Sequence, residues 1–199
     1  MAREVEVKIM LNAKESTTLK KWLKANAQFK KEVKHLEYYL DNPSQTFYFT
    51  HKLGFKDAAK YFRIRMEKEG ASVCLKIFSI DQEKNESKNL DEVEFNVSDA
   101  AAALKLLKLL GFTDKTTVDK KRKVYDYKDF EIVQDCVKGL GEFAEFEYKG
   151  KKSTYKNELE KVFDLLKQIG FKKIRTQSRG YVSMLWNPRD DFTKPKILN

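Results

Sequence analysis

Two short segments combine charged and apolar residues, Glu4-Val-Glu-Val-Lys8 and Glu142-Phe-Ala-Glu-Phe-Glu147. Alternate side chains of an extended strand share one face, so Glu4, Glu6 and Lys8 are expected on the face opposite the valines. Carboxylate oxygens bind hard divalent cations, and a lysine ammonium pairs with phosphate. The pattern therefore suits a divalent metal that carries an anion, although an edge strand with one solvated face shows the same alternation.

The composition is that of a folded domain with a basic surface. The 199 residues are 35% charged and 41% hydrophobic, and no Pro-, Gly- or Ser-rich linker divides them, so one domain is expected. A net charge of +10 favours a polyanionic partner such as a nucleotide or nucleic acid. Much of the lysine is scattered, however, and scattered lysine is typical of a solvated surface.

The cysteines and histidines indicate neither a zinc site nor a disulfide framework. Cys74 and Cys136 lack Cys-x-x-Cys spacing, and both are predicted to be small core residues in a reducing compartment. His35 and His51 have no partner at ligand spacing and are predicted at surface or loop positions. With no apolar run of about 18 residues and no signal-peptide pattern, we expect a cytoplasmic protein without a membrane partner.

A strand followed by an amphipathic helix recurs three times along the chain. Each unit begins with Glu-x-Glu, and the helices are expected over 16–27, 100–110 and 159–169. The second and third helices end in nearly the same letters, Leu-Leu-Lys-Leu-Leu-Gly-Phe at 106–112 and Leu-Leu-Lys-Gln-Ile-Gly-Phe at 165–171. A glycine at such a place predicts a helix C-terminus.

Further strands are predicted between these units, over 29–41, 60–69, 72–78, 116–126 and 130–135. Together they give eight or nine strands, joined mostly as hairpins, and therefore an antiparallel sheet large enough to close. Thirteen charged residues occupy alternating positions in these strands: Glu4, Glu6, Lys8, Arg63, Arg65, Lys76, Glu92, Glu94, Lys120, Arg122, Asp135, Glu145 and Glu147. A barrel could enclose so many charges only with water, metal and a polyanion. The open alternative is a half-exposed sheet whose charges face solvent and whose other face packs on helices.

In order and spacing these residues, with Gly139-Leu-Gly-Glu-Phe-Ala-Glu145, resemble the CYTH superfamily of class IV adenylyl cyclases and thiamine triphosphatases, also called triphosphate tunnel metalloenzymes. The resemblance covers about residues 3–186 and is greatest to the class IV cyclase branch. It implies an α+β fold in which a closed antiparallel eight-stranded β-barrel, the triphosphate tunnel, has helices packed outside. One domain over 1–186 would then be followed by a polar, mobile tail over 187–199.

The resemblance also implies roles for individual residues. The metal, Mg2+ or Mn2+, would be held by Glu4, Glu6 and Glu145, with Glu147, Glu94 and Asp135 as further acidic positions. The phosphates would be bound by Lys8, Arg63, Arg65, Lys76, Lys120, Arg122 and Arg179, and the catalytic residues would be Glu4, Glu6, Lys8 and Lys76. The chain departs from the family at Gly180, where serine is frequent, and in a long aromatic connection over 42–60 that suits a lid, a partner surface or a satellite core.

The resemblance leaves two reactions open and the composition adds a third possibility. If the ribose 3′-hydroxyl attacks the α-phosphorus of ATP, the products are cyclic AMP and pyrophosphate. If water attacks the γ-phosphorus, the enzyme is a triphosphatase of inorganic, nucleoside or thiamine triphosphate. A non-catalytic module for RNA or another polyanion fits the net charge, but the alternation of acidic and basic positions argues against nucleic acid. The sequence leaves open whether the chain forms a homodimer.

Overall fold

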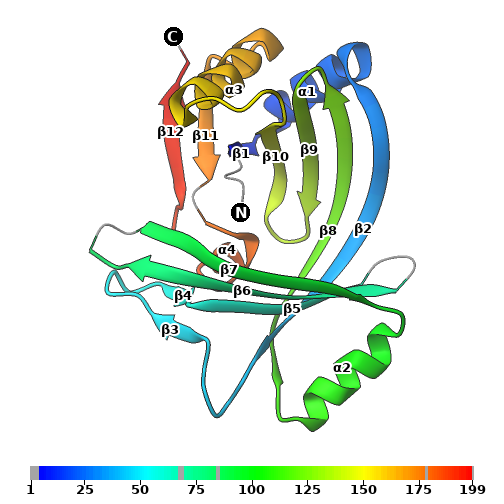
Figure 1. The fold of residues 1–199 in the computed structure, drawn as a ribbon. Coiled ribbons are helices and arrows are strands. Elements are labelled where there is room, and N and C mark those ends of the chain that lie inside the picture. The colour runs from blue at the N-terminus through cyan, green and yellow to red at the C-terminus, as the bar shows by residue number, and fades with distance from the viewer. Residues whose placement is uncertain (1–4, 67–69, 84–85, 178, 199) are drawn as a thin grey trace. The chain divides into compact units, whose positions relative to one another are not determined.

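The computed structural model describes residues 5–66, 70–83, 86–177 and 179–198. Within these residues the strands are β1 Glu6–Leu11, β2 Gln28–Asp41, β3 Tyr48–Thr50, β4 Lys56–Ala58, β5 Lys60–Met66, β6 Ala71–Asp81, β7 Glu86–Val97, β8 Thr113–Tyr127, β9 Phe130–Val137, β10 Gly141–Tyr148, β11 Lys173–Gln177 and β12 Thr193–Ile197 (Figure 1). The helices are α1 Ala13–Asn26, α2 Ala100–Leu109, α3 Tyr155–Ile169 and α4 Tyr181–Trp186. None of the described helices is long and apolar enough to cross a membrane.

Ten strands form one sheet with the hydrogen-bonding order β12-β11-β1-β10-β9-β8-β2-β5-β6-β7, and β3 and β4 form a separate hairpin. The pairings of β1 with β10 and β11, of β10 with β9, of β2 with β5 and of β6 with β5 and β7 are all antiparallel. The predicted α+β fold with a large antiparallel sheet is therefore confirmed. Closure of that sheet into a barrel stays a prediction.

Contacts divide the chain into two compact units. Unit 1 comprises residues 1–33, 121–180 and 191–199, and unit 2 comprises residues 34–120 and 181–190. The long strands β2 and β8 contribute to both units. That residues 1–186 form one domain stays a prediction.

The core of unit 1 lies between one face of the sheet and the helices α1 and α3. Val7, Ile9 and Leu11 of β1 and Ala144, Phe146 and Tyr148 of β10 are the alternate residues that enter it. They meet leucines of α1 and α3, whose apolar positions follow helical spacing. Each buried side chain of this size contributes roughly 1.5–3 kcal/mol to folding. This burial fixes the strand faces and directs the intervening charged residues of β1 and β10 to the opposite side.

The core of unit 2 is smaller. Leu40, Ile64, Ala71 and Val73 are buried at its centre, and α2 packs on it through half-buried residues such as Leu104 and Leu107. The helix begins at the N-cap Asp99, whose Oδ1 accepts a hydrogen bond of 2.9 Å from the Ala102 N–H. No residue of α2 reaches full burial, whereas α3 buries five.

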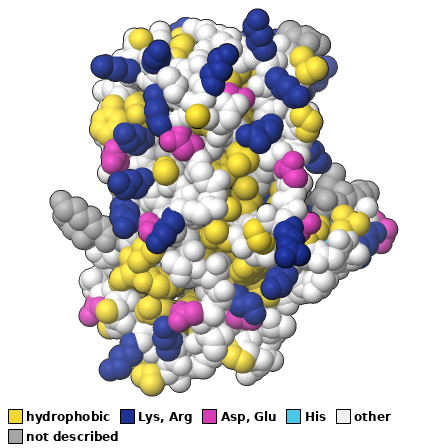
Figure 2. All heavy atoms as spheres, turned by 180° about the vertical axis from the view of Figure 1, so that it is seen from behind, with side chains coloured by type: hydrophobic (Ala, Val, Ile, Leu, Met, Phe, Trp, Pro, Cys, Tyr) yellow, Lys and Arg dark blue, Asp and Glu magenta, His cyan; other side chains and the backbone are white. Residues whose placement is uncertain are grey.

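Basic side chains are spread over the surface. Figure 2 shows lysine and arginine side chains scattered among acidic, polar and apolar ones on the face that it presents. Several of the described lysines are paired there or elsewhere with carboxylates, such as Lys20 with Glu142 and Lys30 with Asp126. The interpretation of scattered lysine as a solvated surface agrees with this distribution.

The threefold strand–helix repeat is confirmed, because α1 follows β1, α2 follows β7 and α3 follows β10. The shared Gly-Phe endings also share their hydrogen bonds. The Phe112 N–H donates to the Leu107 carbonyl at 3.0 Å, and the Phe171 N–H donates to the Leu166 carbonyl at 3.1 Å. The intervening glycines have φ values of 90° and 106°, which place them in the left-handed region. Both helices thus end in the same C-terminal turn.

Substituting Gly170 by alanine is expected to lower the free energy of unfolding by about 1 kcal/mol, because a Cβ at a φ of 106° is strained. A Cβ added there would meet no atom within 4 Å, so the cost comes from the backbone. Gly180→Ala is the matched control, since that position also has open space and lacks a positive φ. Urea titrations measure both variants, and equal midpoints would contradict the expectation.

The aromatic connection over 42–60 folds as the β3–β4 hairpin and contains its own buried residues. Phe47 and Phe55 are buried, and the His51 ring stacks on Phe55 with 4.4 Å between centroids. The prediction of a surface or loop position is wrong for His35, which is buried in β2, whereas His51 lies in the loop between β3 and β4 and is buried there. The sequence around an isolated histidine does not indicate that it is buried, because the aromatic side chain that covers it is brought into place only by folding.

Two further expectations differ from the structure. Cys74 is buried as predicted, but Cys136 is exposed, one residue before the end of β9. The segment predicted as a mobile tail contains β12, which pairs with β11 from Lys173↔Ile197 to Gln177↔Thr193. Its side chains are mostly exposed, so it lacks the apolar alternation that would mark it as a strand. Pro195 is compatible with such an edge position, where no further ladder hydrogen bond is required.

Candidate functional site

The polar face of unit 1 joins charged residues from four neighbouring strands. The Lys8 Nζ lies 2.7 Å from Glu145 Oε1, and the Arg122 Nη2 donates to Glu145 Oε2 at 2.9 Å. Arg122 also donates two hydrogen bonds to Asp135, from Nε to Oδ1 at 2.8 Å and from Nη2 to Oδ2 at 2.6 Å. We call Glu6, Asp135, Glu145 and Glu147, with Lys8 and Arg122, the acidic face.

Strand register produces this arrangement. Lys8 pairs with Glu145 and Glu6 with Glu147 across β1 and β10. Burial alone would raise the pKa of Glu145, but attraction to Lys8 and Arg122 outweighs it and holds that pKa below its usual range. The carboxylate is therefore ionised at neutral pH, as binding a metal or holding cations in place requires.

The pairing of Glu6 with Glu147 places two carboxylates opposite each other on adjacent strands. Like charges in that relation destabilise a sheet unless a cation lies near them. Lys149 supplies one such cation, with its Nζ 2.6 Å from Glu147 Oε1. The acidic face has four carboxylates and two cations, so its charge is net negative.

In unit 2 cations outnumber carboxylates around one buried carboxylate, Glu37. Its Oε1 accepts a hydrogen bond of 2.8 Å from Arg65 Nε and lies 3.2 Å from Lys120 Nζ and 3.8 Å from Arg63 Nη1. The Tyr39 hydroxyl donates to the other oxygen at 3.1 Å. We call Arg63, Arg65 and Lys120 with Glu37 the cationic cluster, in which three cations share a carboxylate that is only 1% exposed.

Burial would raise the pKa of Glu37, yet attraction to Lys120, Arg63 and Arg65 and the Arg65 hydrogen bond lower it from 4.5 to about 2. Sequence reasoning missed this residue, although its signal was available. Glu37 lies between Leu36 and Tyr38 in the predicted strand 29–41, at an alternating position like those of the thirteen charged residues in the other strands.

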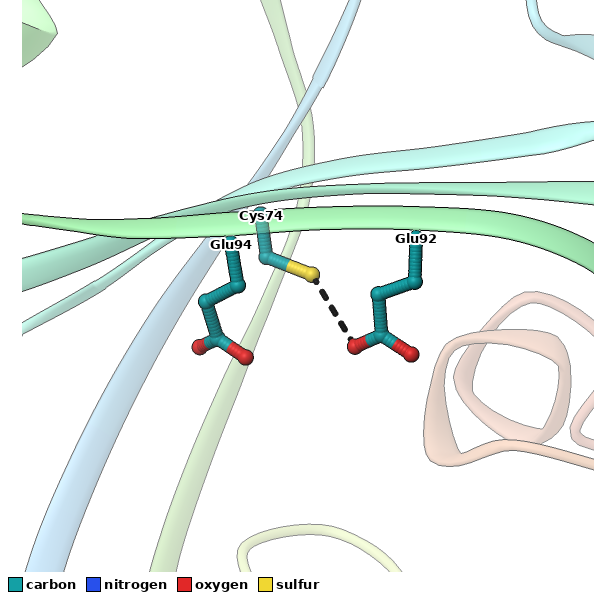
Figure 3. A group of neighbouring side chains, drawn as sticks. All are labelled: Cys74, Glu92 and Glu94. Atoms are coloured by element: carbon teal, nitrogen blue, oxygen red, sulfur yellow. Dashed lines mark hydrogen bonds between the residues drawn. The ribbon is translucent and has the colours of Figure 1, made fainter. Parts of the chain in front are cut away.

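A third group lies on β6 and β7, where the Lys76 Nζ is 2.9 Å from Glu92 Oε1. Figure 3 shows the Cys74 thiol between Glu92 and Glu94, with a contact of 3.6 Å from Sγ to Glu92 Oε1. One ligand atom from each of these three residues lies within 4.8 Å of the others. The Glu94 carboxylate also lies 3.8 Å from Arg63 and 3.9 Å from Arg65, so it extends the cationic cluster.

The remaining predicted site residue of unit 1 is Arg179, which is buried and whose carbonyl accepts a hydrogen bond of 3.1 Å from Gln177 Nε2. In unit 2 the ring of Tyr181 lies under Lys120, 5.3 Å from Nζ to the ring centroid. Glu4, a predicted metal ligand and catalytic residue, lies outside the described residues.

These charged residues lie in a region that matches a known domain. A CYTH domain profile matches residues 2–181, nearly the whole chain. The chain belongs to the CYTH domain family.

Relatives of this CYTH domain include two curated proteins. "Putative adenylate cyclase MJ0240" of Methanocaldococcus jannaschii is 29% identical over 131 residues, 65% of this chain and 73% of that protein. "Adenylate cyclase CyaB" of Aeromonas hydrophila is 27% identical over 90 residues, 43% of this chain and 46% of the other, so the match spans about half of that relative.

The fold is also similar to solved structures. The PH1819 protein of Pyrococcus horikoshii OT3 has a TM-score of 0.70 at 26% identity, with 94% of this chain and 100% of that one covered. The Hippeastrum protein HpAC1, whose structure is described as revealing a dominant triphosphatase activity, has a TM-score of 0.57 at 15% identity, covering 89% and 91%. The latter likeness concerns the fold alone.

The donor chemistry of this CYTH domain fits a hard divalent cation, because Glu6, Glu145 and Glu147 offer carboxylate oxygens on a net negative face. Among the described residues, Asp135, Glu145, Glu147 and Glu6 do not form a group as close as Cys74, Glu92 and Glu94. The guanidinium of Arg122 lies between Asp135 and Glu145 and bonds to both. The Cys74 group fits Mg2+ or Mn2+ less well, since it mixes a thiol with carboxylates and Lys76 already binds Glu92.

Proposed function

We propose that the chain is a metal-dependent phosphoryl-transfer enzyme of the class IV adenylyl cyclase type, which converts ATP to cyclic AMP and pyrophosphate. The observation that supports it best is the separation of charge, with carboxylates in excess on the acidic face and cations in excess in the cationic cluster. A metal-bound triphosphate presents both requirements, since its metal needs carboxylate oxygens and its phosphates need cations. The two curated relatives named adenylate cyclase support the same assignment.

In this proposal the large sheet closes into an eight-stranded tunnel around the substrate. Lys8, Arg63, Arg65, Lys76, Lys120, Arg122 and Arg179 bind the phosphates, while Glu4, Glu6, Glu94, Asp135, Glu145 and Glu147 form the metal-binding set for Mg2+ or Mn2+. Glu4, Glu6, Lys8 and Lys76 are the catalytic residues. The alternation of charged positions with core residues in β1 and β10 supports a charged face on these two strands.

The residues have distinct tasks in the reaction. A bond forms between the ribose 3′-oxygen and the α-phosphorus, the bond from that phosphorus to the oxygen bridging to the β-phosphorus breaks, and the hydroxyl proton leaves to a base or to water. Bound metal supplies charge neutralisation at the phosphate oxygens. Arg63, Arg65 and Lys120 neutralise the charge that develops on the leaving pyrophosphate, and Glu37 keeps Arg65 and Lys120 in place before substrate arrives.

A triphosphatase is the second candidate, because every residue in the proposed site addresses phosphate or metal and none reads a base. Water would then attack the γ-phosphorus and release orthophosphate. The Hippeastrum protein, in which triphosphatase activity dominates, shares this fold.

Incubating the protein with ATP and Mg2+ or Mn2+ separates these assignments. We expect cyclic AMP and pyrophosphate in equal amounts, with less than about one hundredth of the rate in Glu6→Gln because a metal ligand is lost. Orthophosphate without cyclic AMP would support the triphosphatase. A polyanion-binding module predicts a different result. The folded protein would then give no product from ATP, thiamine triphosphate or inorganic triphosphate, and the Glu4→Ala/Glu6→Ala variant would bind RNA as tightly as the wild-type protein.

A further inference from the structure

Ser72 is a buried serine of β6 to which the proposed site gives no role. Its side chain is only 6% exposed, and its Oγ has no hydrogen-bond partner among the described residues. Buried polar groups in folded proteins nearly always have a partner, so an exception calls for an explanation. A hydroxyl that folding leaves unpaired is a candidate for binding a ligand.

Strand alternation places Ser72 on the side of the sheet that carries the cationic cluster. Its neighbours Ala71 and Val73 enter the core of unit 2, so Ser72 points to the other side. Arg65 is its direct partner on β5, and Arg63 is its diagonal neighbour on the same face. The hydroxyl therefore lies beside two cations of the cluster.

The groups around this hydroxyl supply hydrogens rather than accept them. An arginine side chain has donors only, so Arg65 cannot accept from Ser72. β6 lies between β5 and β7, and the backbone carbonyls of a central strand are used by the sheet. The buried carboxylate of Glu37 already accepts hydrogen bonds from Arg65 and Tyr39. The partner that suits Ser72 is therefore an additional acceptor, and the nearby cations favour an anionic one.

The guanidinium of Arg63 also has a donor without an acceptor. Its Nε has no hydrogen-bond partner among the described residues, and its ion pairs with Glu37 and Glu94 are long, at 3.8 Å each. Arg65, by contrast, donates to Glu37 at 2.8 Å. Two donors on neighbouring strands thus have the same need. A phosphate group offers several strong acceptor oxygens and could satisfy both.

We propose that Ser72 and the Nε of Arg63 bind one phosphate group of the substrate, which makes Ser72 a further phosphate-binding residue. This inference rests on the proposed function, because it takes the cationic cluster as the place of the phosphate chain. Glu94 is the side chain that can give way. It lies 3.9 Å from Arg65, is 37% exposed and belongs to the proposed metal-binding set. Its movement from the arginines toward a metal would open the way to the hydroxyl.

Isothermal titration calorimetry of the full chain with pyrophosphate and Mg2+ tests the proposal, because neither proposed reaction consumes pyrophosphate. Ser72→Ala should raise the dissociation constant about tenfold or more, as expected for one hydrogen bond to a charged group. Ser72→Cys keeps the size of the side chain but donates weakly, so it should behave like Ser72→Ala. The urea midpoints of both variants should be no lower than that of the wild type, since folding gives this hydroxyl no partner.

Ser16→Ala is the matched control. Ser16 is also a buried serine, 4% exposed, but its hydroxyl donates to Glu142 on the side of unit 1 that meets α1. This variant should lower the urea midpoint and leave the affinity for pyrophosphate unchanged. A ligand-binding role of Ser72 predicts the opposite pattern, which a structural role would not produce.

Three results would overturn the inference alone while the enzyme still forms its product. The Ser72 variants could bind pyrophosphate as tightly as the wild type, or Ser72→Ala could lose affinity only together with a fall in stability like that of Ser16→Ala. In the third, a wild-type chain with turnover would bind no pyrophosphate. A folded wild-type chain that neither binds pyrophosphate nor forms product from any triphosphate would remove the proposed function, and the role of Ser72 with it.

Discussion

Replacing Glu145 by glutamine is expected to lower kcat/KM for the triphosphate substrate by about 10³-fold, or about 4 kcal/mol in transition-state stabilisation. The substitution removes the charge that pairs with Lys8 at 2.7 Å and with Arg122 at 2.9 Å. It also removes an oxygen ligand from the proposed metal set. Steady-state rates, measured for whichever product the wild-type enzyme releases, determine the size of the effect.

Glu142→Gln is the matched control for this experiment. Glu142 lies on the same strand but on the face that meets α1, where it binds Lys20 and Ser16. Its loss should change kcat/KM by less than about threefold, because it is remote from the polar face. The fold should survive Glu145→Gln, since glutamine keeps the shape of the side chain and Asp135 still binds Arg122. Equal activities of the two variants would remove Glu145 from the site.

The largest effect on stability is expected from Glu37→Gln, which should lower the free energy of unfolding at pH 7 by about 3 kcal/mol. The variant leaves Arg65 and Lys120, and the more distant Arg63, facing a neutral group in a buried position. Urea unfolding followed by fluorescence measures the difference. Glu32→Gln, on the exposed part of the same strand and 3.2 Å from Lys123, should cost no more than about 0.5 kcal/mol.

The lowered pKa of Glu37 predicts that the free energy of unfolding depends on pH. Its pKa is lower in the folded state, at about 2, than the ordinary value of 4.5. The unfolded chain therefore binds the proton first, so the contribution of Glu37 is complete above pH 4.5 and is lost as pH falls toward 2. Wild-type stability should fall more steeply than that of Glu37→Gln across this interval, and parallel curves for the two proteins would contradict the assigned ionisation.

Alternation in the strands predicted most of the architecture. Val7 and Ile9 of β1, with Phe146 of β10, show a core face so clearly that the direction of the intervening charges follows from the sequence. The repeated Gly-Phe endings likewise predicted two helix ends that share the same hydrogen bonds. Both features depend on residues close in the chain, and local patterns report such features well.

Local patterns did not predict which charged side chains form ion pairs with one another. Arg122 binds Asp135 and Glu145 because β8, β9 and β10 are neighbours in the sheet, and strand order is a property of the whole fold. The alternating position of Glu37 was visible in the sequence, but its cationic partners were not, because they come from β5 and β8, far away in the chain. β12 was missed because an exposed edge strand needs no apolar face.

The two cysteines give the protein a natural means of selective labelling. Burial raises the pKa of the Cys74 thiol, and a protonated, enclosed sulfur reacts slowly with alkylating reagents. Cys136 is exposed and lies directly after Asp135 on β9. A maleimide fluorophore would thus attach at one position without engineering, on the face of β9 opposite to Asp135.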